Sequence, residues 1–152
     1  MKKYAFFIII LLIITGFLPA QSTASEIEAL LETNTVTYAQ AVRFVLDAAD
    51  VLSTSNPEEA FRYAVEQKWL PQGVSPGDIA RLDGISLLIM RSFDLKGGIM
   101  YSIFKNPHYA YRELVYKDII YGMIFPKMTV TGENLLIYIA RLLDINEALE
   151  EN

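Results

Sequence analysis

The stretch that decides the fold is Asn56–Arg62, NPEEAFR, which returns fifty positions later as Asn106–Arg112, NPHYAYR. At the same offset, Arg91–Leu95, RSFDL, returns as Arg141–Ile145, RLLDI. Two matches at one offset argue against coincidence. Repeats of this length are typical of supersecondary units that bury their apolar faces against neighbouring copies. The sequence therefore predicts an architecture built from a repeated unit.

Working outward from this stretch, three positions carry signals for the start of a helix. Asn56 and Asn106 can accept hydrogen bonds from the first free N–H groups, and each is followed by a proline, which suits the first helical position. Thr37 is followed three residues later by Gln40, which is the pattern of a capping box. We therefore expect helices to begin directly after these three residues.

Apolar residues at helical spacing and Gly- or Pro-containing stops outline about five helices. The expected helices cover 38–52, 57 to about 69, 85–93, 107–121 and 135–143. In the fourth helix, we expect a buried face made of Ala110, Tyr111, Leu114, Val115 and Ile119. Residues 99–105 are apolar and aromatic but too few to assign. The predicted fold class is all-α, with helix-loop-helix pseudo-repeats.

The N-terminus has the pattern of a secretory signal peptide. Lys2 and Lys3 precede an apolar run from Ala5 to Leu18, and small residues follow at Ser22–Ala24. We expect cleavage after Ala24, whereas an uncleaved membrane anchor is the alternative. The expected organisation is a signal peptide at 1–24, a linker with one turn of helix at 25–35, a helical domain at 36–146 and a fraying acidic tail at 147–152.

The charge balance narrows the classes of partner. The predicted leader holds two of the 13 basic residues and none of the 18 acidic ones, so 11 basic and 18 acidic residues remain, a net charge of −7. This balance disfavours nucleic acid and anionic lipid as partners and leaves the membrane a role only through an uncleaved leader. The absence of cysteine excludes disulfides and a lipid-modified cysteine.

The order of these signals resembles the S-layer homology repeat, a helix, a loop and a second helix that opens with Ile-Thr-Arg-Ala-Glu. The corresponding segments are Val36–Gln40 (VTYAQ) and Val130–Asn134 (VTGEN). For the middle copy, either Val74–Asp78 (VSPGD) or Ile79–Asp83 (IARLD) can correspond, and the sequence leaves both open. The resemblance covers residues 35–145 and implies an envelope-associated helical bundle.

Members of that family hold a cell-wall polysaccharide with the arginine of the signature and an aromatic residue of the first helix. In this chain only Arg81 and Trp69 match those roles, because the first and last copies lack the arginine. From the residues themselves, aromatic side chains beside an arginine suit a sugar or peptide groove, and the candidates off the buried stripe are Tyr101, Tyr109 and Tyr116. Arg112 is the candidate arginine, with a structural ion pair to a neighbouring acid as its alternative.

No pattern in the chain predicts catalysis. His108 is the single histidine and stands at the second position of a capped helix, without a second histidine or a cysteine to share a metal. No nucleophile elbow, phosphate loop or dinucleotide fingerprint occurs. We therefore expect no catalytic residue, metal or cofactor; a pocket of titratable groups around His108 would reopen the enzyme hypothesis.

Together these patterns predict a non-catalytic, exported module of the cell envelope, in the periplasm or on the cell surface. Its expected role is binding or structural, with a cell-wall glycan as the candidate ligand. The alternative is a protein-interaction module or periplasmic assembly factor that grips a second envelope protein with the same aromatic residues.

Overall fold

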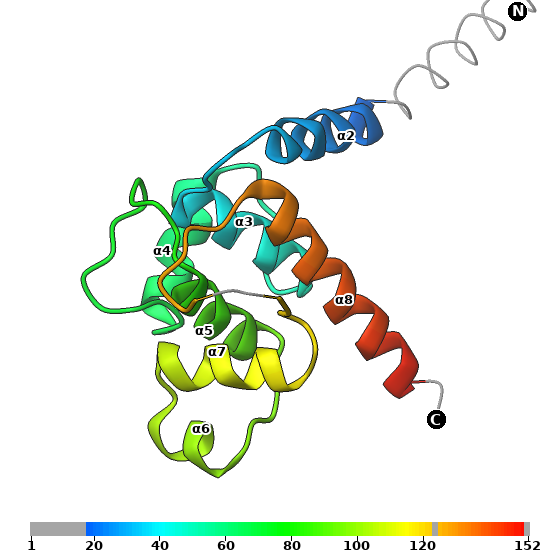
Figure 1. Cartoon of the computed structure of the whole chain (residues 1–152). Helices are drawn as coiled ribbons and strands as arrows, with labels where there is room; N and C mark the ends of the chain where they lie inside the picture. The colour runs from blue at the N-terminus through cyan, green and yellow to red at the C-terminus, as the bar shows by residue number, and fades with distance from the viewer. Residues whose placement is uncertain (1–17, 123–124, 151–152) are drawn as a thin grey trace, which may run out of the picture.

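The structure, a computed structural model, describes residues 18–122 and 125–150, with side chains for 24–122 and 125–147. Within these ranges it holds seven helices and no strand, so the all-α class is confirmed (Figure 1). The expectation of about five helices is wrong. The two additional helices are α2 (Leu18–Leu31) and α6 (Ile99–Phe104).

Helix α2 replaces most of the expected linker at 25–35. It is anchored through Leu30, which is 3 % exposed, and through an ion pair between Glu26 and Arg43 of α3. The cleavage point after Ala24 lies inside α2, and residues 1–17 of the expected signal peptide lie outside the described residues. Cleavage therefore stays a prediction. No helix in the described part of the chain is long and apolar enough to cross a membrane.

Three helices begin at a closed ring of backbone hydrogen bonds. They are α3 (Tyr38–Ala48), α5 (Leu82–Ser92) and α8 (Gly132–Glu150). The N–H of Val36 donates to the carbonyl of Val130 at 2.9 Å, that of Ala80 donates to Val36 at 2.8 Å, and that of Val130 donates to Ala80 at 3.2 Å. Because each segment both donates and accepts, the three helix starts are fixed to one another.

The middle helix of this ring begins at Leu82, directly after Arg81. Of the two segments left open for the middle copy, Val74–Asp78 does not precede a helix directly, and Ile79–Asp83 overlaps the start of α5. The Asp78 carboxylate instead closes a turn by accepting a hydrogen bond from the Ser75 N–H at 2.7 Å. The Asp78 carbonyl accepts from the N–H of Tyr38 at 3.0 Å, which ties this loop to the start of α3.

Two further helices, α4 (Pro57–Glu66) and α7 (Pro107–Tyr116), begin as their sequences predict. The Asn56 side chain accepts from the Glu58 N–H and the Asn106 side chain accepts from the Tyr109 N–H, each at 3.0 Å. The capping box at Thr37 is also present. Helix α4 packs on α3, α7 packs on α5, and α6 lies beyond α7 at the end of the molecule away from α2 (Figure 1).

Four helices end earlier than the sequence predicts. Helices α3, α4, α5 and α7 are each closed by a non-glycine residue with positive φ, namely Asp50, Lys68, Asp94 and Asp118. After each, the chain folds back so that an N–H reaches a carbonyl in the last turn, as when Trp69 donates to Ala64 at 2.9 Å. Trp69 and Gly122 therefore lie in loops beyond their helices.

The core is formed by the facing sides of α3, α4, α5, α7 and α8. Ala110, Leu114 and Ile119 are buried as expected, but Val115 is 38 % exposed because it lies on the outer side of α7. The residues at the centre of the core include Val45, Leu46, Ala60, Ala64, Ile85, Leu88, Ile89 and Leu135. Helix α8 continues to Glu150, so the first residues of the expected fraying tail are helical.

Candidate binding groove

A groove of about 590 Å³ opens where the loop after α4, the C-terminal end of α5 and helix α6 meet. This volume is in the range of small-molecule sites. We call it the basic groove, and it is lined by Trp69, Met90, Arg91, Asp94, Leu95, Lys96, Gly97, Tyr101, Ser102 and Lys105.

Helix α6 forms one wall of the basic groove and is held in place by close backbone contacts. A Cβ added to Gly97 would lie 2.6 Å from the Tyr101 ring, so only glycine allows this approach. The Gly98 N–H donates to the Glu113 carboxylate of α7 at 2.9 Å. Lys105 ends the helix with φ of 43° and donates its N–H to the Tyr101 carbonyl. The sequence Lys96–Lys105 thus builds a short, folded-back wall.

Two side chains that line the groove each hold a buried polar atom without a hydrogen-bond partner among the described residues. These atoms are the Nε of Arg91 and the hydroxyl of Tyr101. Buried polar groups are nearly always paired, so such atoms call for a partner from outside the chain, such as water or a ligand. Both groups can donate, and a protonated guanidinium can only donate. The arrangement therefore favours a ligand that presents acceptor oxygens.

The Tyr101 hydroxyl keeps its proton over the whole neutral range. Burial raises the pKa of this phenol above its ordinary value, and the Glu113 and Asp94 carboxylates act in the same direction, while the Arg91 guanidinium lowers the pKa. Because Tyr101 is 4 % exposed, the loss of hydration dominates. The hydroxyl is thus a neutral donor beside a charged one.

The charge of the groove lining is opposite in sign to that of the chain. Arg91, Lys96 and Lys105 face a single acidic residue, Asp94, whereas the whole chain carries −5. Clustered cations with few acids raise the local concentration of anionic and oxygen-rich ligands. The groove can therefore attract a ligand that the average charge of the protein would repel.

Trp69 supplies the aromatic wall. It follows Lys68, whose left-handed backbone turns the chain sharply at the end of α4, and its ring meets Tyr63 edge-on at 5.9 Å between centroids. The indole is half-buried and also lines the groove. An aromatic face beside fixed hydrogen-bond donors is the combination that orients a ligand with apolar faces and polar edges.

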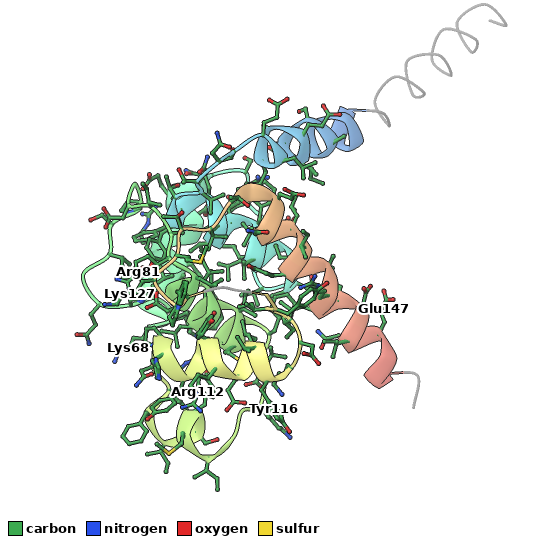
Figure 2. All side chains as sticks on the ribbon, in the orientation of Figure 1. Lys68, Arg81, Arg112, Tyr116, Lys127 and Glu147 are labelled. Carbon is green, nitrogen blue, oxygen red and sulfur yellow. The ribbon has the colours of Figure 1, made fainter. Side chains whose placement is uncertain are left out.

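Of the six residues predicted to bind a ligand, the structure brings Trp69 and Tyr101 together in the basic groove. Tyr109 lies outside it, stacked on Phe104 with 5.5 Å between ring centroids. Arg112 and Tyr116 are exposed on α7, and Tyr116 is 84 % exposed. Figure 2 shows both of them away from Arg81.

Arg81 has a different environment from the one its resemblance implies. It lies at the start of α5, whereas the groove is at the end of that helix, and its side chain pairs with the Asp83 carboxylate at 2.6 Å. The backbone of Arg81 pairs with that of Thr129 in the loop that precedes α8, and Figure 2 labels Arg81 apart from Arg112 and Tyr116. Arg81 and Trp69 therefore do not line a common groove.

Sequence reasoning missed the charged residues of the groove, above all Arg91, Lys96 and Lys105. One signal was present, because Arg91 belongs to the repeated segment Arg91–Leu95 and has a counterpart at Arg141. Its role could not be read from the sequence, since it depends on how α6 folds back over the end of α5.

A second groove of about 580 Å³ lies on the other side of Lys105 and is largely apolar. We call it the apolar groove, and it is formed by Val65, Lys68, Leu70, Pro71, Gln72, Gly73, Val74, Leu87, Lys105, Asn106 and Pro107. Its charged residues are Lys68 and Lys105, and most of the other lining residues are apolar. Its lining suits an apolar side chain of a partner better than a sugar.

The single histidine of the chain lies outside both grooves. This residue, His108, meets Tyr109 edge-on with 5.3 Å between ring centroids. Within the described ranges, no group of three or more His, Cys, Asp or Glu side chains is placed to hold a metal ion. The chemistry on this side of the molecule is that of hydrogen-bond donation, cationic attraction and aromatic contact.

Comparison of the chain with family models, with curated proteins and with solved structures finds no match.

Proposed function

We propose that this chain is a non-catalytic, exported binding module of the cell envelope, and that it holds a cell-wall glycan in the basic groove. One observation carries the proposal: Arg91 and Tyr101 line a groove that Trp69 also lines, and the Arg91 Nε and the Tyr101 hydroxyl are buried beside it without a partner among the described residues. A glycan offers many acceptor oxygens to the donors and apolar ring faces to the indole. The signal-peptide pattern at 1–24 supports export.

The arrangement of the helix starts supports an S-layer-homology-like pseudo-repeat. Val36, Ala80 and Val130 exchange equivalent hydrogen bonds around one ring, and each directly precedes the residue before a helix. In this proposal Ala80-Arg81 occupies the middle position, which agrees with the alternative Ile79–Asp83 to within one residue. The glycan site then differs from the one that the resemblance implies, because Arg91 takes the place of Arg81.

Retention of the full-length protein on purified peptidoglycan and on wall polymer tests the proposal. At physiological salt we expect Arg91→Gln to lower retention about tenfold or more, the equivalent of one lost charged hydrogen bond. We expect Trp69→Ala to lower retention about tenfold as well, because the aromatic contact is lost. Matched controls are Arg112→Gln and Tyr116→Ala, which remove the same kinds of side chain outside the groove. These controls share the apolar leader, so adhesion through the leader cancels in the comparison.

Two outcomes would contradict the glycan version. One is no retention of the unmodified protein on either polymer, and the other is an equal loss in the groove variants and in the two controls. Folding of each variant is verified by its helical circular dichroism before retention is compared.

The second function, a protein-interaction module or periplasmic assembly factor, is favoured by the apolar groove. Its lining of Val65, Leu70, Val74 and Leu87 suits an apolar anchor from a partner protein. This version predicts co-purification with an envelope protein that is reduced by Val65→Glu and unaffected by Arg91→Gln. Glycan retention would show the opposite sensitivity, so the two functions are separable.

A further inference from the structure

Helix α6 turns most of its apolar side chains outward. Ile99, Met100, Ile103 and Phe104 are 79 %, 47 %, 66 % and 55 % exposed, and we call these four residues the apolar tip. Among the six residues of α6, only Tyr101 is buried. Single exposed apolar residues are ordinary, but a contiguous exposed group of this kind marks an interaction site.

The apolar tip is flanked by basic residues. Between Leu95 and Arg112 the sequence contains Lys96, Lys105 and Arg112 and no acidic residue. All three are exposed. The nearest acidic residue on α7, Glu113, directs a carboxylate oxygen to the Gly98 N–H at 2.9 Å. Asp94, just before this stretch, lines the basic groove with Lys96 and Lys105. The end of the molecule around α6 is thus apolar with more cations than carboxylates, although the chain as a whole is acidic.

The shape of this end restricts the occupant. Helix α6 lies at the extremity of the molecule beyond α7, on the side opposite α2 (Figure 1). A protein partner would need a cavity that matches an outward-facing helix, whereas a fluid bilayer deforms around it. Apolar side chains surrounded by lysine and arginine are the composition of segments that enter the interface of anionic membranes.

We propose that the apolar tip docks on an anionic lipid surface, with Ile99 and Ile103 entering the interface and Lys96 and Lys105 meeting lipid phosphates. This inference goes beyond the proposed function, because neither isoleucine lines the basic groove. The net negative charge of the chain opposes anionic surfaces only as an average. Within a distance of about 10 Å, the screening length at moderate salt, the local cations dominate.

The experiment must separate the tip from the apolar leader, so the reporter is placed in the tip itself. The full-length protein carries one tryptophan, Trp69. In a Trp69→Phe background, Ile103→Trp places the sole indole on the tip, and Leu143→Trp places it at a 40 % exposed position on α8 as the matched control. Both proteins are mixed with vesicles of seven parts phosphatidylcholine and three parts phosphatidylglycerol, with and without brominated phosphatidylcholine.

We expect the emission of the Ile103→Trp protein to shift to the blue and to be quenched by the brominated lipid, while the Leu143→Trp protein shows neither change. Quenching should fall when phosphatidylglycerol is omitted or salt is raised, because the cationic contacts weaken. In the same reporter background, with the indole left at position 103, Ile99→Ser should lower the apparent lipid affinity about fivefold, whereas Ile145→Ser on α8 should not change it.

Three outcomes would overturn the proposal. Equal quenching of both reporters would show that the leader, not the tip, holds the protein on the vesicle. A blue shift of the tip reporter that depends on protein concentration and not on lipid would show that the tip pairs with a second copy. No change in the tip reporter at low salt would show that the tip stays in water. None of these three results would change the glycan retention expected for the Arg91→Gln protein, so the test of the proposed function stays independent.

Discussion

Arg141 and Arg91 hold matching positions in two segments that are fifty residues apart, yet their surroundings differ. The guanidinium of Arg141 donates to the Ile119 carbonyl at 2.8 Å and lies 3.7 Å from the centroid of the Tyr121 ring. The Nε of Arg91 has no hydrogen-bond partner in the described part of the chain, and its side chain lines the basic groove.

The difference follows from how the chain continues after each segment. After Arg141, helix α8 runs on to Glu150, and the arginine reaches across to the loop that follows α7. After Arg91, helix α5 ends at Ser92, Asp94 turns the backbone, and α6 packs on α7 with Tyr101 lining the same groove as Arg91. The same local sequence thus holds a paired arginine in one region and an arginine with a buried, unpaired Nε beside a groove in the other.

The largest expected effect contrasts these two arginines directly. Arg141→Gln removes a charged hydrogen bond to a backbone carbonyl and a cation–π contact, so we expect the free energy of unfolding to fall by about 1.5–3 kcal/mol. Arg91→Gln removes a charge whose Nε is unpaired, so we expect a change within about 0.5 kcal/mol. Urea denaturation followed by circular dichroism measures both, and equal destabilisation would refute the contrast.

The next effect concerns α6, which forms one wall of the basic groove. In Gly97→Ala, the new methyl group would lie 2.6 Å from Cδ1 of Tyr101 and 3.0 Å from its Cβ, so α6 must move or the ring must leave its position. We expect a loss of about 1–2 kcal/mol in the free energy of unfolding, as for other overpacked sites, and reduced glycan retention. Gly77→Ala is the control, because nothing lies within 4 Å of its new methyl group.

If Gly97→Ala kept both the stability and the retention of the unmodified protein, the close contact between Gly97 and Tyr101 would not define the groove. A loss of the same size in Gly77→Ala would also remove the argument, since it would report glycine replacement in general.

The helix starts were predictable because their signals are local. Thr37 with Gln40, and Asn56 and Asn106 each with the following proline, act on N–H groups within three residues, and the structure shows all three caps. The helix ends were not predictable from local signals. The residues that close them adopt a left-handed backbone that local preference assigns to glycine, and they are Asp50, Lys68, Asp94 and Asp118. Packing of the apolar residues that follow, such as Ile119 and Ile120, fixes these turns.

The basic groove was only partly predictable, because it too depends on contacts between distant parts of the chain. Trp69 was a candidate through the family resemblance and Tyr101 as an aromatic residue off the main stripe. The link between them requires the loop after α4, the end of α5 and α6 to meet. Arg91 lies on a helix with an almost wholly buried sequence, so nothing in its local pattern distinguishes it from a structural arginine. Long-range contacts therefore decide which residues become a site.

A smaller effect is expected from alkaline pH. Burial raises the pKa of Tyr38, Tyr101 and Tyr138 above the unfolded value of 10.0, so the folded state holds these protons more tightly than the unfolded state does. Their contribution to stability is complete below pH 10 and is lost as pH rises through the folded pKa values. Urea midpoints should therefore fall above pH 10. A midpoint independent of pH between 9 and about 11 would contradict the buried placement of the phenols.

The smallest effect on stability, and the sharpest separation of stability from binding, is expected for Tyr101→Phe. The substitution keeps the ring against Gly97 and removes a buried hydroxyl that has no partner among the described residues. A buried polar group without a partner costs free energy, so its removal should leave the free energy of unfolding unchanged or raise it by up to about 1 kcal/mol. Glycan retention should fall, because the neutral donor beside Arg91 is lost.

Tyr38→Phe is the matched control, because the Tyr38 hydroxyl accepts a hydrogen bond from the Arg81 N–H at 3.4 Å and lies in the closed ring region. We expect it to lower stability slightly and to leave retention unchanged. If Tyr101→Phe destabilised the protein as much as Tyr38→Phe and left retention intact, the Tyr101 hydroxyl would be structural. Opposite responses of Tyr101→Phe and Tyr38→Phe would place ligand binding in the basic groove and stability in the closed ring of backbone hydrogen bonds.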